Sequence, residues 1–340
     1  MNKTTRVSWI FLALLLLIPV SQAGTDNARP WLPGLLEKDS ITIVITDSGL
    51  GGLSVVADAA EKLRQNPVFK SVELVFVNAL FSDAGGYNSL QTRAEKLRVF
   101  NNALQSMQDR YDPDIILVAC NTLSVLIPDT EFARASQVPV AGIVEDGVEQ
   151  IAQQLQDKPG AMNILFATKG TVDEGTHKKL LLEMGFKDEQ IVTQACPQLT
   201  LYIEQGYDSM YTEMLIDAYV DEAVSGMGEI DGPLSISFNC THFGYALESW
   251  KQAFATRGIE VQAVLDPNTQ MVDFLLGEPR FEQSAIDVRV VSMIDIPADS
   301  RDSIGRYLDG VSPATAAALR GFEQVPDLFA WQDLGGNEAK

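Results

Sequence analysis

The sequence predicts an α/β protein of two similar parallel-sheet domains, each a three-layer arrangement with helices on both faces of its sheet. Short runs rich in β-branched residues alternate with amphipathic, helix-length segments along most of the 340-residue chain. These runs are apolar at consecutive positions, which is typical of strands buried on both faces. Motifs of the first half recur in the second half, and this similarity predicts a pseudo-twofold relation between the domains.

Strand-like runs follow one another in a regular order, and each is expected to contribute one strand. The first group comprises ITIVIT (41–46), VELVFV (72–77), IILVAC (115–120) and PVAGIV (139–144). The second comprises NILFAT (163–168), QIVTQAC (190–196), SISFNC (235–240), VQAVLD (261–266) and VRVVSM (288–293). Amphipathic segments such as 54–64 and 90–110 lie between them and are expected to be helices.

The internal similarity also suggests domain boundaries. VACNT, around Cys120, resembles FNCTH, around Cys240. We expect a first domain of residues 38–138 plus 243–310, a second of residues 139–242, and a C-terminal helix and tail over 311–340. Because ligands of open parallel sheets bind beyond the carboxyl ends of the strands, the active site is expected in the interdomain cleft.

The first 23 residues have the pattern of a secretory signal peptide. Lys3 and Arg6 form a basic start, residues 7–20 are almost entirely apolar, and Ser21-Gln22-Ala23 is a small-residue cleavage signature. The apolar core of about 14 residues is shorter than the roughly 20 that a membrane span needs, so a retained anchor is the alternative. We expect cleavage after Ala23 and a periplasmic or secreted mature chain.

The charge balance limits the classes of partner. The net charge is −21, and without residues 1–23 it becomes −23, because 23 basic residues then face 46 acidic ones. Such a field repels phosphate backbones and anionic lipids, so nucleic acid is excluded and no membrane partner is expected after cleavage. A small-molecule ligand is expected, with a homodimer as the candidate assembly.

Three cysteines in an exported chain cannot all pair, and Cys120, Cys196 and Cys240 are not clustered as in a zinc site. No metal is therefore expected, and thiol chemistry is. Cys120 and Cys240 each end a strand before a helical segment, where backbone N–H groups and the helix dipole lower a thiol pKa. Taken singly, each could instead be a buried small hydrophobe.

Two thiols on opposite walls of a cleft favour a specific reaction. One removes a proton from one face of a carbon while the other returns a proton to the opposite face, which inverts a stereocentre without a cofactor. His242 could assist the thiol of Cys240, and Glu204 could orient His242 or be a solvated helix carboxylate. His177, the other histidine, is expected to face solvent.

Donors for a bound carboxylate follow the predicted strands. Asn121, Thr122 and Thr241 offer amide and hydroxyl groups beside the two cysteines. The glycine-rich segment 47–52 permits close backbone approach. It could also open a dinucleotide-binding fold, but it lacks the three-glycine fingerprint of that fold.

Taken together, these motifs resemble the aspartate/glutamate racemase superfamily, and most closely glutamate racemase. The matching stretches run in order over roughly residues 41–270. They are TDSGLGGLSV (46–55), VACNTLS (118–124), VPVAGIVEDGV (138–148), ATKGTVDEG (167–175), ACPQLTLYIEQG (195–206), NCTHFGYAL (239–247) and VLDP (264–267).

The resemblance implies a role for each site residue. Cys120 and Cys240 would be the acid/base thiols, with Cys120 acting on the D-enantiomer and Cys240 on the L-enantiomer. Asp47 would tune Cys120, whereas Glu204 and His242 would tune Cys240. The residues that would hold the substrate are Ser48, Asn121, Thr122, Thr171 and Thr241.

The chain departs from the family pattern in one important loop. Asn78 stands where an aspartate is usual, and the Pro-Tyr-Gly sequence that follows in the family is absent from residues 79–89. A milder change is VEDG at 144–147, where Val-Glu-Pro-Gly is usual. These changes leave the identity of the amino acid open.

The expected function is a cofactor-independent amino-acid racemase, an isomerase acting on an acidic or related amino acid in the periplasm, where it would use or release D-amino acids. The alternatives are another reaction of the superfamily, such as hydantoin racemisation or decarboxylation, and an exported amino-acid-binding protein without turnover.

Overall fold

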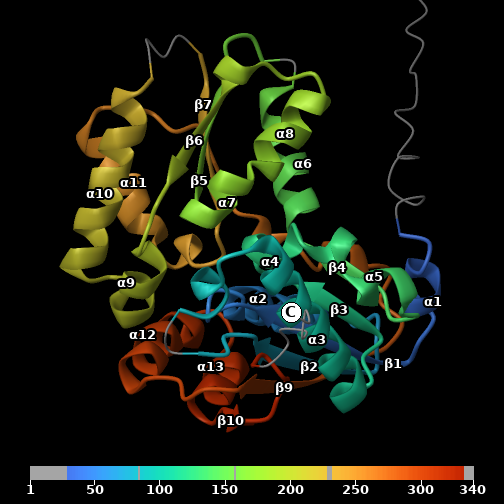
Figure 1. Ribbon diagram of the computed structural model, residues 1–340. Helices are drawn as coiled ribbons and strands as arrows, with labels where there is room; N and C mark the ends of the chain where they lie inside the picture. The colour runs from blue at the N-terminus through green and yellow to red at the C-terminus, as the bar shows by residue number, and fades with distance from the viewer. Residues whose placement is uncertain (1–28, 83–84, 157, 228–231, 333–340) are drawn as a thin grey trace, which may run out of the picture.

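Figure 1 shows the computed structural model, which describes residues 29–82, 85–156, 158–227 and 232–332. The predicted signal peptide therefore lies outside the described residues, as does the end of the predicted tail. No helix in these described ranges is long and apolar enough to cross a membrane.

The first sheet has six parallel strands in the order β10-β9-β2-β1-β3-β4. In sequence they are β1 (Ser40–Asp47), β2 (Ser71–Asn78), β3 (Ile115–Val118), β4 (Val140–Gly142), β9 (Ala285–Ser292) and β10 (Glu323–Gln324). Asp47 lies opposite Asn78, and Thr46 lies opposite Val118. The register therefore brings the carboxyl ends of β1, β2 and β3 to one edge.

The second sheet has four parallel strands in the order β6-β5-β7-β8. They are β5 (Met162–Ala167), β6 (Ile191–Ala195), β7 (Leu234–Asn239) and β8 (Ala263–Leu265). Ala167 is paired with both Ala195 and Asn239, so β5, β6 and β7 end at the same level. In Figure 1 this sheet occupies the upper domain and the first sheet the lower domain.

Helices cover both faces of the first sheet. Ile43 and Ile45 of β1 belong to one hydrophobic cluster with α2, whereas Val44 packs with α3 on the other face. The helices of this domain are α1 (Leu32–Leu36), α2 (Leu53–Gln65), α3 (Arg93–Tyr111), α4 (Asn121–Ser124), α5 (Glu131–Ala135), α12 (Ala298–Asp309) and α13 (Pro313–Arg320).

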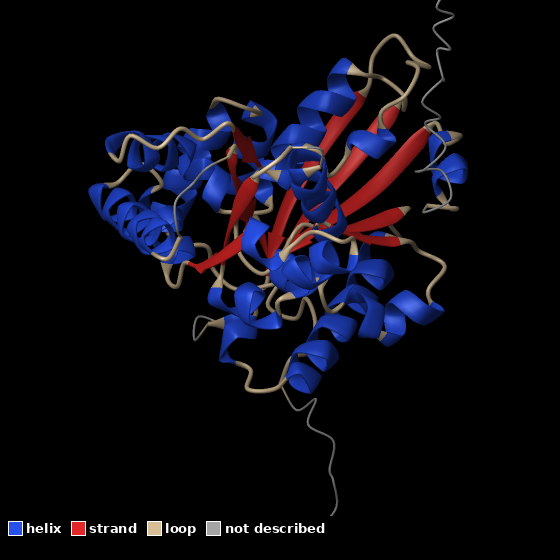
Figure 2. Cartoon of the chain, turned by 90° about the horizontal axis from the view of Figure 1, so that it is seen from above, coloured by secondary structure: helices blue, strands red, loops and turns tan. Residues whose placement is uncertain are grey.

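The second sheet is covered in the same way. Phe166 of β5 contacts Trp250 of α11, whereas the adjacent Leu165 packs in a cluster with α6 and α8. The helices are α6 (Val144–Leu155), α7 (Lys169–Glu174), α8 (Thr176–Glu183), α9 (Leu199–Gly206), α10 (Met210–Ser225) and α11 (Leu247–Thr256). Figure 2 shows strands inside and helices outside, and the predicted class of two three-layer α/β domains is confirmed.

Two strands join a different sheet from the one that the expected boundaries assign to them. β4, expected to open the second domain, pairs with β3 in the first sheet, and β8, expected in the first domain, pairs with β7 in the second. In each case the chain adds one more strand at the adjacent sheet edge before it crosses to the other domain. Within the predicted C-terminal segment, α13 is a helix and β10 adds to β9.

Candidate active site

The two cysteines of the internal repeat lie at the carboxyl ends of strands from different sheets. Cys120 follows β3 and precedes α4, and its Sγ is 3.1 Å from the Ser48 Oγ. Cys240 follows β7, and its Sγ is 3.9 Å from Nδ1 of His242. Both side chains are about 5% exposed, and all three cysteines of the chain are free thiols. Each thiol is therefore buried beside a polar side chain, which for Cys120 comes from the adjacent strand end of β1 and for Cys240 from the segment after its own strand.

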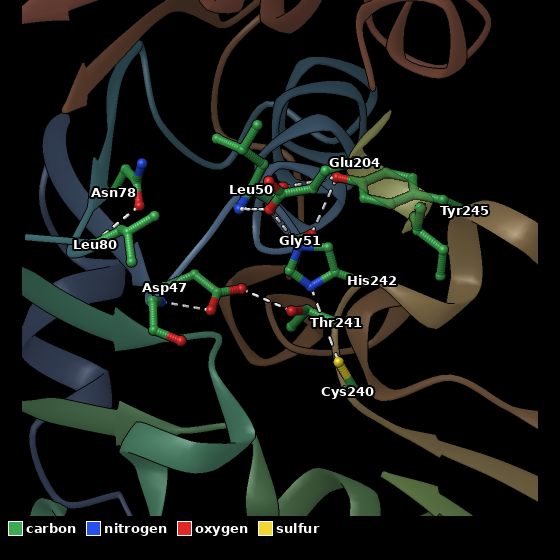
Figure 3. A network of polar contacts seen from close by, with 12 residues as sticks. Asp47, Leu50, Gly51, Asn78, Leu80, Glu204, Cys240, Thr241, His242 and Tyr245 are labelled. Carbon is green, nitrogen blue, oxygen red and sulfur yellow. Dashed lines mark hydrogen bonds and ion pairs between the residues drawn. The ribbon is translucent and has the colours of Figure 1, made fainter. Parts of the chain in front are cut away.

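Hydrogen bonds across the domain boundary join the loop after β1 to the segment after β7 and to α9 (Figure 3). The Thr241 hydroxyl donates to Oδ2 of Asp47 at 2.7 Å. The backbone N–H of Leu50 donates to Oε1 of Glu204 at 3.0 Å. The same Oε1 atom lies 2.7 Å from Nε2 of His242. The predicted orientation of His242 by Glu204 is thus present, and the loop after β1 takes part in it.

The glycine-rich loop after β1 approaches its neighbours closely because it lacks side chains. A Cβ on Gly51 would lie only 2.1 Å from Oγ1 of Thr241. The hydroxyl of Tyr245 donates to the carbonyl oxygens of Leu50 and Gly51, at 3.0 and 3.1 Å. The loop is therefore held against the segment after Cys240, as the predicted close approach requires.

His242 carries a strongly stabilised proton. Burial alone would lower the pKa of its imidazole, but hydrogen bonds and charge interactions with Cys240 and Glu204 outweigh burial and raise the pKa well above its usual value. An imidazolium at this position has one N–H toward the Cys240 sulfur and the other toward the Glu204 carboxylate.

Cys120 differs from the expectation that a helix N-terminus lowers its pKa. Burial and the negative charge of Asp47 raise the pKa of Cys120 well above the usual thiol range. Hydrogen bonds from Ser48 and from the backbone of Leu123 act in the opposite direction but are weaker. The helix that follows has only four residues, so its dipole is small. The charge of Asp47 therefore acts to raise the pKa of the Cys120 thiol, and its catalytic tuning role stays a prediction.

Three threonine hydroxyls form a group between the domains. Thr122 Oγ1 lies 3.2 Å from the Thr171 hydroxyl and 3.4 Å from the Thr168 hydroxyl, and these two are 3.0 Å apart. Thr168 was not predicted as a site residue. Its sequence signal is a threonine three residues before Thr171 at a helix start, because its side chain accepts from the Thr171 N–H as the N-cap of α7.

The expectation that His177 faces solvent is wrong. Its side chain is 2% exposed, and Nε2 lies 3.0 Å from Oδ1 of Asn121. Burial lowers the pKa of His177 to about 4, so the ring is neutral near pH 7. The chain turns at Gly175, which has a φ of 64° between α7 and α8, and this turn directs α8 so that His177 points inward.

Comparisons with known proteins agree with this arrangement. No protein-family model matches the chain. The glutamate racemase of Sulfurihydrogenibium sp. is 26% identical over 202 residues, which are 59% of this chain and 70% of the relative. That of Aquifex pyrophilus is 27% identical over the same length, with the same two coverages. The chain is a homologue of the glutamate racemases.

Solved structures of glutamate racemases share the fold of this homologue. The enzyme of Thermus thermophilus, in complex with β-chloro-D-alanine, has a TM-score of 0.59 at 20% identity and covers 85% of this chain and 98% of its own. The enzyme of Escherichia coli, in complex with L-glutamate and an activator, has a TM-score of 0.57 at 21% identity, with coverages of 79% and 95%.

The loop after β2, which departs from the family pattern of this glutamate racemase homologue, begins at Asn78. The side chain of this asparagine is buried and hydrogen-bonded within the protein. Asn78 is 2% exposed; its Nδ2 donates to Oγ of Ser292, and its Oδ1 accepts from the backbone N–H of Leu80, both at 3.1 Å. The amide thus links β2 to β9 and fixes the direction of the loop. Residues 83–84 of the loop lie outside the described ranges.

Proposed function

We propose that this chain is a cofactor-independent amino-acid racemase, an isomerase that inverts the α-carbon by proton transfer between two thiols. The observation that carries the proposal is the pair of buried cysteines at equivalent strand ends of the two domains, each with its own polar partner. The homologous glutamate racemases support it. A binding protein without turnover has no need for two such thiols.

The proposed reaction has two balanced proton transfers. With the D-enantiomer, the Cys120 thiolate takes the α-proton, and the Cys240 thiol gives its proton to the opposite face of the resulting carbanion. The L-enantiomer reacts in the reverse direction, starting from a Cys240 thiolate. Because burial and Asp47 raise the pKa of Cys120, its thiolate is a stronger base than an ordinary one. That strength suits the removal of a weakly acidic α-proton.

The proposed substrate is an acidic or related amino acid. Its carboxylate would be held by neutral donors, because the predicted binding residues are Ser48, Asn121, Thr122, Thr171 and Thr241. The relatives' names and the bound L-glutamate of the Escherichia coli structure support an acidic substrate. Because the loop after Asn78 differs from the family pattern, the proposal also includes amino acids related to the acidic ones.

We further propose that the chain is exported and acts in the periplasm or outside the cell. The support is the sequence of residues 1–23, with its basic start, apolar core and small-residue end. An exported racemase would serve the use or release of D-amino acids rather than their supply to cytoplasmic synthesis.

The decisive experiment is proton NMR of the purified, reduced chain in heavy water with L- and D-glutamate, L- and D-aspartate, and a panel of other amino acids. We expect loss of the α-proton signal together with formation of the opposite enantiomer. The double variant C120S/C240S is the matched control and should be inactive. Measurable binding of an amino acid without exchange would replace the proposal with an amino-acid-binding protein.

A further inference from the structure

Asn121, which stands between Cys120 and Thr122 in the sequence, has a buried amide donor without a partner among the described residues. Asn121 is 3% exposed, and its Nδ2 atom has no hydrogen-bond partner within the described part of the chain. Its neighbours in sequence are Cys120 and Thr122, which contact Ser48 and Thr171. Since leaving a buried N–H group unpaired is unfavourable, this donor is expected to have a partner when the site is occupied.

The oxygen of the Asn121 amide already has a hydrogen-bond partner. Oδ1 of Asn121 lies 3.0 Å from Nε2 of His177, which comes from α8 in the other domain. A carbonyl oxygen only accepts, so Nε2 of His177 must carry the proton in this pair. His177 is neutral near pH 7 because burial lowers its pKa to about 4, which leaves Nδ1 without a proton.

This pairing selects one of the two orientations of the amide. With Oδ1 on His177, the NH₂ group is free for a ligand; with the amide turned over, Oδ1 would be the free atom. A free carbonyl oxygen repels a carboxylate, whereas a free N–H donates to it. The ring of His177 therefore decides whether Asn121 attracts or repels an anionic group.

We propose that His177 is a positioning residue that fixes the Asn121 amide so that Nδ2 donates to a carboxylate oxygen of the bound amino acid. The proposal rests on the proposed function, because it names how that same site recognises its substrate. Since His177 and Asn121 belong to different domains, the donor is correctly oriented only when α8 and α4 are in contact.

The first test needs no substitution, because the chain contains only two histidines. Selective ¹⁵N-histidine labelling of the untagged chain gives the Nδ1 and Nε2 signals of two imidazole rings. We expect one ring to remain neutral between pH 5 and pH 9 as the Nε2–H tautomer, and this ring should be His177. The Nδ1–H tautomer in that ring would overturn the proposal, because the amide would then have to donate to Nε2.

The second test compares H177F, which keeps ring bulk but lacks the donor, with H177Q, whose side-chain amide can donate to Oδ1. We expect H177F to raise KM by about 10-fold or more with a smaller change in kcat, as expected for lost binding of a charged group. H177Q should restore KM to within about 3-fold of the wild-type value. In an N121A background, H177F should add no further effect, because both changes remove the same contact.

Circular dichroism and the thermal midpoint check that each variant is folded. Equal losses in H177F and H177Q, or an additional loss from H177F in the N121A background, would assign His177 a packing role and overturn the proposal. If the wild-type chain shows no proton exchange, the proposed function fails instead. Calorimetric binding of the same amino acids to wild type, H177F and H177Q then tests His177 separately, with a weaker Kd expected for H177F alone.

Discussion

Cys120 and Cys240 hold equivalent places in the two domains but have oppositely charged neighbours. The Cys120 thiol lies beside the Ser48 hydroxyl and feels the carboxylate of Asp47. The Cys240 thiol lies beside the imidazole of His242, whose pKa is raised well above its usual value, against burial, by interactions with Cys240 and Glu204. The internal repeat thus conserves the position of the thiol but not its electrostatics. Changes on one wall should consequently affect one direction of the reaction more than the other.

Removal of either thiol should have the largest effect. In C120S and C240S the hydroxyl cannot replace the thiolate as a base near neutral pH, so racemisation should fall by about 10²–10⁴-fold, the usual contribution of general acid–base catalysis. Each variant can keep proton exchange with one enantiomer. In C120S, which retains Cys240, this is the L-enantiomer, and in C240S, which retains Cys120, it is the D-enantiomer. Exchange rates in heavy water from pure L- and D-substrate measure this. Near-full racemisation by either variant would refute the two-thiol mechanism.

Loss of the charge on Glu204 should have a smaller effect, mainly on the proton transfer by Cys240. In E204Q the His242 pKa falls because the carboxylate that favours its proton is gone. We expect exchange from the L-enantiomer to slow by about 10-fold, which corresponds to about 1.4 kcal/mol. Exchange from the D-enantiomer should change less. E189Q, at an exposed carboxylate before β6, is the control. Equal slowing in both directions would mean that Glu204 acts on the whole cleft.

The smallest effect should be a shift in the pH dependence of proton exchange by Cys120. Because burial and Asp47 raise the pKa of Cys120, exchange from the D-enantiomer should still increase with pH above the usual thiol range. D47N removes the negative charge, so the Cys120 pKa falls and the increase should begin at lower pH. The pH profile from the L-enantiomer is the internal control. A displacement to higher pH would show that Asp47 has another role, such as accepting a proton.

The strand ends could be predicted from sequence because each apolar run stops at a small or polar residue, and Asp47, Cys120 and Cys240 all lie there. The pair of Glu204 with His242 was also predicted, although only as one alternative. The inward position of His177 could not be predicted, because it depends on the turn at Gly175 between two short helices. A local pattern cannot show such a change of direction.

The pKa of Cys120 and the sheet membership of two strands also could not be predicted from local sequence patterns. The pKa of Cys120 depends on burial and on Asp47, which is 73 positions earlier in the chain. The expected helix-terminus effect is present but smaller. β4 and β8 have ordinary apolar patterns, and these patterns do not indicate with which sheet each strand pairs. The sheet to which each strand belongs is decided by the rest of the fold.

The position of β9 has a consequence for synthesis of the chain. β9 pairs with β2 along eight residues, although residues 79–284 separate the two strands and include the whole second sheet. A chain emerging from the ribosome can therefore complete the second domain while the apolar strand β2 still has one edge without its partner. Open edges of this kind promote association between chains. The nascent protein is thus most prone to aggregation during the interval that ends when β9 emerges.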